Sequence, residues 1–376
     1  MSASVGKTRV LVVDDSVVMR RIISEVVAAD ADLEVAGYAA NGQIALNLLE
    51  QVSPDVVTLD IEMPILDGLA TLKAMRAKHC RVPVIMFSTL TERGAEATID
   101  SLALGASDYV AKPVELGSYN AARERIREAL LPKIKALCRP GTVLGVAARA
   151  SSAAQAALRR NKIAGRIDVV AIGCSTGGPN ALAQILPSFP RELAVPVLIV
   201  QHMPATFTRF LAQRLSSLCP VPVEEAAGGE LLKPGTIWVA PGGFHMSVAR
   251  DGASGKLEIT QGPPENSCRP SVDVLFRSLP GIFANRVLGV VLTGMGQDGL
   301  RGCERLADAG AQIMVQDEAT SVVWGMPGFV AKAGLADGIL PISEIGARIV
   351  ERVAAFRPLA GHRPTPPSMP ASRALP

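Results

Sequence analysis

Short apolar runs alternate with amphipathic helical patterns along most of the chain. In its first third, five runs have the length of buried strands: Val10–Val13, Leu33–Ala39, Val56–Leu59, Val84–Phe87 and Tyr109–Ala111. Helical patterns lie between and after them, at Val17–Ala28, Gly42–Glu50, Gly68–Ala77, Arg93–Leu104 and from about Ser118. This alternation predicts a doubly wound α/β domain with five parallel strands, over residues 8–125.

A second alternation begins at Ile167 and continues to about Phe356. Its strand-like runs are Val169–Ile172, Val195–Val200, Thr236–Ala240, Val287–Leu292 and Gln312–Val315. They predict a second doubly wound domain with a mostly parallel sheet, over residues 167–356. Residues 126–166 first continue the last helix and then form a basic, Ala-rich linker. The Pro-rich residues 357–376 are predicted to be a disordered tail.

Composition narrows the class of protein. The 376 residues are enough for two domains, and 48% hydrophobic with 19% charged residues is typical of buried parallel sheets. A net charge of +3 gives no reason to expect a nucleic-acid partner. No apolar run approaches the roughly 18 residues of a membrane span, so no membrane insertion is expected. The six scattered cysteines lack a C-x-x-C pair, which favours reduced thiols in the cytoplasm.

Three carboxylates follow predicted strands of the first domain. Asp14 and Asp15 end the first strand and Asp60 ends the third, so all three should meet at the carboxyl edge of the sheet. Clustered carboxylates repel unless a cation neutralises them, and oxygen ligands suit Mg²⁺. Ser88 and Lys112 end the fourth and fifth strands. This set of groups predicts a magnesium-dependent phosphoryl acceptor.

The same positions resemble the receiver domain of bacterial response regulators. The matching segments are Val12–Ser16, Leu59–Pro64 with Asp67-Gly68, Ser88-Thr89 and Lys112-Pro113. The resemblance implies a flavodoxin-like fold in which a histidine kinase phosphorylates Asp60. It also implies that Asp14, Asp15 and Asp60 bind Mg²⁺, and that Ser88, Tyr109 and Lys112 form the conformational switch.

In the second domain, three polar residues follow predicted strands. Ser175 lies in Gly173-Cys174-Ser175-Thr176-Gly177, a G-x-S-x-G pattern that exposes a serine at a helix N-terminus. His202 follows the run Val195–Val200. Asp298 follows Val287–Leu292 in a Gly-rich turn. Their common sheet edge favours a serine nucleophile, a histidine base and an orienting acid.

Each assignment has a competitor in the sequence. His245 also follows a strand-like run, and Asp273 and Asp317 are rivals of Asp298. Cys174, next to the serine, is interpreted as a small buried hydrophobic residue rather than the nucleophile. The order Ser–His–Asp along the chain differs from that of α/β-hydrolases, so the G-x-S-x-G pattern indicates another parallel-sheet fold.

Together the segments of the second domain resemble the protein-glutamate methylesterases of bacterial chemotaxis, the CheB family. They are Ile172–Pro179, Gln201–Pro204, Ala240–Gly242, Arg269–Asp273 and Leu292–Gly299. The resemblance implies a carboxylic ester hydrolase that removes methyl esters from chemoreceptor glutamates and deamidates receptor glutamines. It makes Ser175, His202 and Asp298 catalytic, without a cofactor for this reaction. Thr176 and Met295 are implied active-site neighbours, with the Met295 amide a candidate oxyanion donor.

The tandem order suggests how the two domains cooperate. We expect the unmodified receiver to cover the catalytic crevice and phosphorylation of Asp60 to weaken that contact. The alternative is a phosphorylation-switched binding module with a vestigial hydrolase site. A transcriptional response regulator is disfavoured, because the second half has no basic helix-turn-helix pattern.

Overall fold

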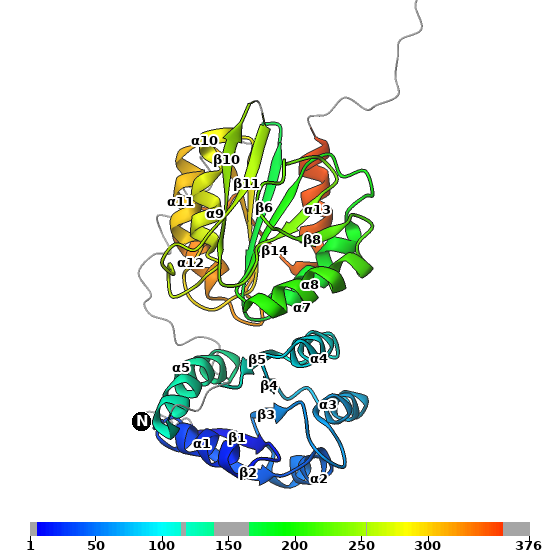
Figure 1. Cartoon of the computed structure of the whole chain (residues 1–376), viewed down its shortest axis with the longest axis vertical. Coiled ribbons are helices and arrows are strands. Elements are labelled where there is room, and N and C mark those ends of the chain that lie inside the picture. The colour runs from blue at the N-terminus through cyan, green and yellow to red at the C-terminus, as the bar shows by residue number, and fades with distance from the viewer. Residues whose placement is uncertain (1–5, 114–117, 139–164, 253, 356–376) are drawn as a thin grey trace, which may run out of the picture.

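The computed structural model describes residues 6–113, 118–138, 165–252 and 254–355, and they form two α/β domains (Figure 1). The first domain has a five-stranded parallel sheet of order β2-β1-β3-β4-β5. Its strands are β1 (Thr8–Val13), β2 (Leu33–Ala39), β3 (Val56–Asp60), β4 (Val84–Ser88) and β5 (Asp108–Ala111). This is the predicted flavodoxin-like arrangement, with all five strand runs confirmed.

The helices of the first domain begin at polar capping residues. Side-chain oxygens of Ser16, Asn41, Asp67 and Thr91 each accept a hydrogen bond from a backbone N–H in the first turn that follows. Such caps satisfy donors that the helix leaves free. The helices are α1 (Val17–Ala28), α2 (Gly42–Val52), α3 (Gly68–Ala77) and α4 (Glu92–Ala103).

The fifth helix, α5 (Tyr119–Cys138), extends past the end of the predicted domain. Its residues Ile126, Leu130 and Ile134 recur every four positions and are buried in the core with side chains of β1 and β3. The predicted domain limit at residue 125 therefore falls inside a helix that belongs to the first domain. The rest of the predicted linker, residues 139–164, and the predicted tail lie outside the described residues.

The second domain contains a seven-stranded parallel sheet of order β14-β13-β12-β6-β7-β9-β8. The strands are β6 (Val169–Cys174), β7 (Val197–Gln201), β8 (Val223–Glu225), β9 (Ile237–Val239), β12 (Val287–Val291), β13 (Gln312–Gln316) and β14 (Gly338–Leu340). An antiparallel hairpin of β10 (His245–Asp251) and β11 (Ser254–Thr260) forms a separate two-stranded sheet, which the strand pattern does not predict.

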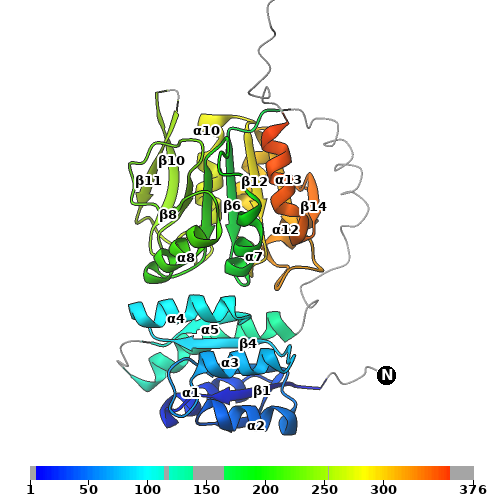
Figure 2. The same cartoon turned by 90° about the vertical axis from the view of Figure 1, so that its right-hand side faces the viewer.

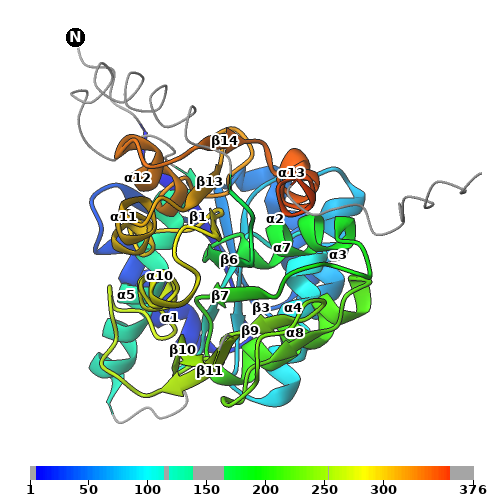
Figure 3. The same cartoon turned by 90° about the horizontal axis from the view of Figure 1, so that it is seen from above.

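Helices cover both faces of this sheet (Figure 3). One face carries α7 (Gly178–Ile185), α8 (Ala205–Leu218) and α13 (Ile342–Ala354); the other carries α9 (Val272–Ser278), α10 (Pro280–Phe283), α11 (Leu300–Asp308) and α12 (Met326–Lys332). Successive residues of β6 point alternately to the two cores: Val170 and Ile172 to one, Val169 and Ala171 to the other. Burial on both faces explains why the strand runs are continuously apolar.

The strand order of the second sheet determines where a ligand site can lie. The chain passes from β6 to β7 on one side, and later returns to β12 on the other side of β6. The carboxyl ends of these three strands therefore lie next to one another at a topological switch point, where open α/β sheets bind ligands. Figures 1 and 2 show the first domain beneath this part of the second, with α4 close to α8.

Candidate active site and receiver pocket

Ser175 is fixed through its backbone. Its N–H donates to the carbonyl of Thr293 (3.0 Å), and its own carbonyl accepts from Gly178 N (2.8 Å) and from Nε2 of Gln201 (3.0 Å). The residue lies between β6 and α7 and is partly exposed. Its hydroxyl donates to no acceptor in the part of the chain that the structure describes. The side chain is therefore free to turn toward a reaction partner.

Gly294 allows the loop after β12 to approach the serine. A Cβ at this position would lie 2.9 Å from Cβ and 3.0 Å from N of Ser175, closer than real Cβ atoms tolerate. The backbone around Met295 thus comes beside the nucleophile candidate. Met295 is next to this close approach, and its N–H has no backbone acceptor among the described residues. Both properties suit an oxyanion donor.

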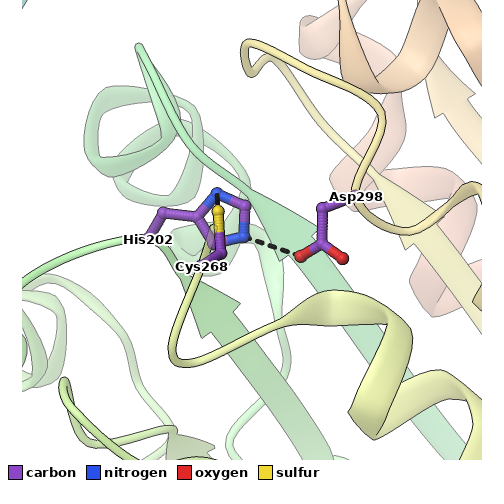
Figure 4. Close-up of side chains that lie close together, drawn as sticks. All are labelled: His202, Cys268 and Asp298. Carbon is purple, nitrogen blue, oxygen red and sulfur yellow. Dashed lines mark hydrogen bonds and ion pairs between the residues drawn. The ribbon is translucent and has the colours of Figure 1, made fainter. Parts of the chain in front are cut away.

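His202 and Asp298 form a direct pair (Figure 4). Nε2 of the imidazole lies 2.8 Å from Oδ2 of Asp298, whose side chain is almost completely buried. Asp298 also accepts hydrogen bonds from Asn266 Nδ2, Ser271 Oγ and the backbone N–H groups of residues 272 and 273. The carboxylate is thus held rigidly behind the ring, as an orienting acid must be.

Pairing lowers the pKa of Asp298 and raises the pKa of His202. Burial alone raises the pKa of Asp298, but hydrogen bonds from His202, Ser271 and Val272 N–H outweigh it and lower the pKa to about 2. Burial lowers the pKa of His202, whereas hydrogen bonds with Asp298 and Cys268 raise it to about 9. At neutral pH the acid is therefore ionised and the imidazole is mostly protonated, so the ring becomes a free base only as the pH rises toward its pKa.

The residues that compete with His202 and Asp298 in the sequence have other partners. Both ring nitrogens of the buried His245 are engaged: Nε2 lies 3.0 Å from the carbonyl of Pro263, and Nδ1 accepts from Ser271 N (3.2 Å). Asp273 accepts from Gly299 N and Gly302 N, and Asp317 caps the turn at Thr320. None of the three pairs with His202 among the described residues.

Cys174 is fully buried, and its Sγ lies 3.1 Å from Oε1 of Gln201. Burial raises the pKa of its thiol well above the usual range. A thiol that stays protonated cannot compete with Ser175 as nucleophile, in agreement with the interpretation of its sequence position.

The first domain reaches into the site. Thr176 Oγ1 donates to Oδ2 of Asp108 at the start of β5 (2.7 Å), and Lys133 Nζ of α5 lies 2.6 Å from the same oxygen. The ring of Tyr109 stacks on Phe207 of α8, with centroids 4.9 Å apart. These contacts are largely buried and join the two domains directly at the loop that holds Ser175 and Thr176.

The covered crevice is small. The cavity lined by Ser175, His202, Asp108, Tyr109 and Thr176 has a volume of ≈ 20 Å³, which is about the space of one water molecule. This cavity has no room for a glutamyl ester. The described conformation is consequently a closed one.

Sequence reasoning missed several residues of this site: Asn266 and Cys268 around the His202–Asp298 pair, and Asp108 and Lys133 from the first domain. Asn266 and Cys268 lie in a loop that no buried strand precedes. Asp108 is visible in the sequence only as the residue before a strand-like run. No local pattern marks any of them as functional.

In the first domain, Lys112 joins two of the predicted acidic residues. Its Nζ lies 2.7 Å from Asp60 and 3.0 Å from Asp14, both nearly fully buried. Oxygens of Asp14, Asp15 and Asp60 lie within 4.8 Å of one another, and Asp15 is exposed. Ser88 ends the neighbouring strand β4, and its Oγ donates to the carbonyl of Gly94 in α4 (2.8 Å).

Burial and the nearby Asp14 raise the pKa of Asp60 to about 6, although Lys112 opposes the shift. The single positive charge of Lys112 thus does not balance the three carboxylates of the cluster. The ligand set is all oxygen, with one side open to solvent through Asp15, which fits a hydrated Mg²⁺ better than a soft metal.

Comparison with known proteins identifies the two parts. The family model for the CheB methylesterase matches residues 170–349, and that for the response regulator receiver domain matches residues 10–122. A protein-glutamate methylesterase/protein-glutamine glutaminase of Trichodesmium erythraeum is 50% identical over 349 residues, which cover 92% of this chain and 99% of that protein. The chain belongs to the CheB methylesterase family.

A second member of the CheB methylesterase family bearing the same name, from Nocardioides, is 50% identical and covers 93% of this chain and 96% of its own length. The crystal structure of the Thermotoga maritima CheB methylesterase catalytic domain is 37% identical, with a TM-score of 0.49 over 50% of this chain and 99% of that one. Among the described residues, no helix is both long and apolar enough to cross a membrane.

Proposed function

We propose that this chain is a phosphorylation-activated hydrolase of chemotaxis-type signalling. It removes methyl esters from glutamates of methylated chemoreceptors, releases methanol and deamidates receptor glutamines. Family membership and relatives of nearly full coverage support the activity. The observation that carries the mechanism is the 2.8 Å pair of His202 and Asp298 in the crevice that Ser175 lines.

In the proposed reaction, Ser175 Oγ attacks the ester carbonyl while His202 takes its proton. Nε2 is committed to Asp298, so the base is Nδ1. The protonated ring then gives that proton to the departing methoxide, and methanol leaves an acyl-enzyme that water hydrolyses. General acid–base catalysis of this kind typically contributes about 10²–10⁴-fold. With a glutamine substrate the same sequence releases ammonia.

Met295 and Thr176 support the reacting groups in this proposal. The N–H of Met295, brought close by Gly294, stabilises the oxyanion, and loss of one such donor typically costs about 10²–10³-fold in rate. Thr176 follows the nucleophile, and its hydroxyl is tied to Asp108 in the closed form. When the domains separate, that hydroxyl becomes available to the substrate.

Methanol release from a methyl-labelled receptor tests the catalytic proposal. We expect Ser175→Ala to abolish release, whereas Ser217→Ala, which removes an exposed hydroxyl of α8, should retain it. Release by Ser175→Ala at the wild-type rate would refute the serine mechanism. Absence of release from the wild type, with and without a phosphodonor, would favour a binding module with a vestigial site.

For the receiver, we propose that a histidine kinase phosphorylates Asp60. Asp14, Asp15 and Asp60 would hold Mg²⁺, which offsets negative charge on the transferring phosphoryl oxygens when bound. Lys112, already in contact with Asp60, supplies a second positive charge to the same oxygens. The cytoplasm, where such kinases and receptor tails meet, stays the predicted location.

Regulation follows from the closed crevice. Phosphate on Asp60 draws Ser88 and Lys112 toward it, changes the packing of Tyr109 and weakens the contact between domains. The stack of Tyr109 on Phe207 is the physical link between the two events. A small phosphodonor with Mg²⁺ should raise methanol release by the full chain and leave Asp60→Asn unchanged. Equal rates with and without phosphodonor in the wild type would remove the regulatory proposal.

A further inference from the structure

Gln201 is buried in the candidate site and is not used by the proposed reaction. It is the last residue of β7, it is 2% exposed, and it lines the same cavity as Ser175 and His202. A buried amide destabilises the fold unless its two N–H groups and its oxygen find partners. The partners of Gln201 therefore show what this side chain holds in place.

The amide nitrogen of Gln201 joins the main chain of Ser175 to that of His202. Nε2 donates to the carbonyl of Ser175 (3.0 Å) and to the carbonyl of His202 (3.3 Å). The side-chain amide has two N–H groups, which is one for each carbonyl. Among the described residues, no other side chain bonds to the main chain of both Ser175 and His202.

The oxygen of the same amide fixes its orientation. The thiol of Cys174 donates to Oε1 (3.1 Å), and burial raises the pKa of this thiol, so that it keeps its proton. If the amide were turned over, its oxygen would face two carbonyl oxygens and lose both hydrogen bonds. On the other side, Gly178 leaves the space that Oε1 needs, because a Cβ there would lie 2.0 Å from it. The amide is therefore held in one orientation, with Nε2 toward the two carbonyls.

The sheet by itself does not reach as far as Ser175 and His202. The parallel pairing of β6 with β7 ends with Cys174 opposite Gln201, and the N–H of His202 makes a last bond across, to the carbonyl of Cys174 (3.2 Å). Beyond this point the two chains diverge, one into α7 and the other toward α8. The amide of Gln201 supplies the next connection between them, at the two residues that must exchange a proton.

We propose that Gln201 is a positioning residue that sets the separation of Ser175 and His202. The inference rests on the proposed function, in which His202 takes the proton of Ser175. Gln201 acts only through the main chain of these two residues and binds no part of the receptor. A displacement of about 1 Å between reacting groups can cost about 10²-fold in rate. Loss of the two N–H donors should therefore lower kcat and leave KM close to that of the wild type.

Gln201→Met tests the proposal, because methionine keeps the length of the side chain and removes both donors. Methanol release by the full chain, with phosphodonor and Mg²⁺, should show kcat lowered by about 10²-fold at an almost unchanged KM. Gln184→Met makes the same change at an exposed position of α7 and should keep the wild-type kcat. The unfolding temperature of each variant, followed by circular dichroism, gives the loss of stability separately. A wild-type kcat in Gln201→Met would overturn the proposal, since a side chain that only fills space is replaced by one of the same length.

Crystal structures of the wild type and of Gln201→Met test the same role without relying on activity. The carbonyl oxygens of Ser175 and His202, which Nε2 bridges in the wild type, should lie farther apart in the variant. Gln201→Glu, which keeps the shape but turns an acceptor toward the carbonyls, replaces Gln201→Met if that variant does not fold. An unchanged separation would overturn the proposal whatever the rates. A larger separation, without methanol release from any variant or from the wild type, would support the positioning role and count against the esterase proposal alone.

Discussion

At the scale of single residues, the site depends on how each group is held. Ser175 is fixed by backbone hydrogen bonds while its hydroxyl stays free, whereas Asp298 is fixed through its carboxylate oxygens. His202 receives its orientation from the acid. This division of roles suits a reaction in which the serine and the imidazole exchange a proton and the carboxylate only orients and stabilises.

The raised pKa of His202 gives a pH prediction. The base must be neutral to accept a proton, so activity is lost as pH falls below the pKa of the ring. Because that pKa is raised from the ordinary histidine value of 6.5 to about 9, kcat/KM should still be rising above pH 7. Asp298→Asn should move the inflection to lower pH and reduce kcat by up to about 10⁴-fold.

Rates of methanol release between about pH 6 and 10 measure this profile around the neutral-to-basic range in which the imidazole titrates. Asp317→Asn is a suitable control, since Asp317 caps a turn and does not touch the imidazole. A wild-type inflection at or below the ordinary value of 6.5 would contradict the assigned pair.

Gly294 gives a second prediction at this scale. In Gly294→Ala the new methyl would meet Ser175 at 2.9 Å and Sδ of Met326 at 2.4 Å, so the two loops must separate. A displacement of about 1 Å can cost about 10²-fold in rate. We expect kcat to fall by about that factor. The unfolding temperature, followed by circular dichroism, is measured alongside kcat for each variant. Gly281→Ala, which meets no atom within 4 Å, should change neither quantity.

At the scale of secondary structure, the sequence predicts the long elements well. The inner strands β1, β3 and β4, and the three strands that precede Ser175, His202 and Asp298, are apolar runs, and burial on both faces makes such runs continuous. Ser175, His202 and Asp298 follow those strands, which is why their convergence could be predicted. The roles that the resemblance gives them stay predictions until variants are measured.

Shorter or edge elements leave no comparable signal. Strands β8 and β14 have three residues each, too few to show a period, and β10 pairs with β11 outside the main sheet. Residues 261–271, which contribute Asn266 and Cys268, come from this irregular region. Their placement depends on tertiary packing against α9, and a sequence pattern does not report that.

The contact between α4 and α8 supports a prediction about elements. Arg209 of α8 pairs with Glu92 of α4 at 2.5 Å, and both side chains are substantially exposed. Arg209→Glu would place two acids together and loosen the closed form. Because exposed ion pairs contribute only about 0.2–1 kcal/mol, methanol release without phosphodonor should rise severalfold at most.

The exchange of charges provides the control. The double variant Glu92→Arg with Arg209→Glu restores an opposite-charge pair at the same place, and its basal rate should return toward that of the wild type. An equal rise in the single and the double variant would show that the pair does not stabilise the closed form.

At the scale of the whole molecule, one hydrophobic cluster crosses the domain boundary. It includes Ala106 and Tyr109 of the first domain together with Ala181 and Phe207 of the second. Composition and periodicity predict two domains, but neither can show which surfaces meet. That contact brings Asp108 to the loop that holds Ser175 and Thr176, so the receiver is part of the environment of the candidate site.

Removal of the receiver tests this arrangement. A fragment of residues 165–355 keeps its own sheet, both helical layers and the Ser175–His202–Asp298 crevice, so we expect it to fold. Without Asp108 and Tyr109 over the cavity it represents the open state. It should release methanol faster than the full chain without phosphodonor, and a phosphodonor should not change its rate.

The ratio of the two rates then measures the closed population. If the full chain is about 99% closed, the fragment should be about a hundredfold faster. To make the full chain about 99% open instead, the phosphoryl group and its contacts would have to supply about 5.5 kcal/mol. A single phosphoryl group paired with Lys112 is expected to supply part of this, so the activated full chain should fall between the two rates. The rate of the fragment is therefore the upper limit for the rate of the activated full chain. A folded fragment no faster than the unmodified full chain would show that the receiver does not restrain the esterase by covering it.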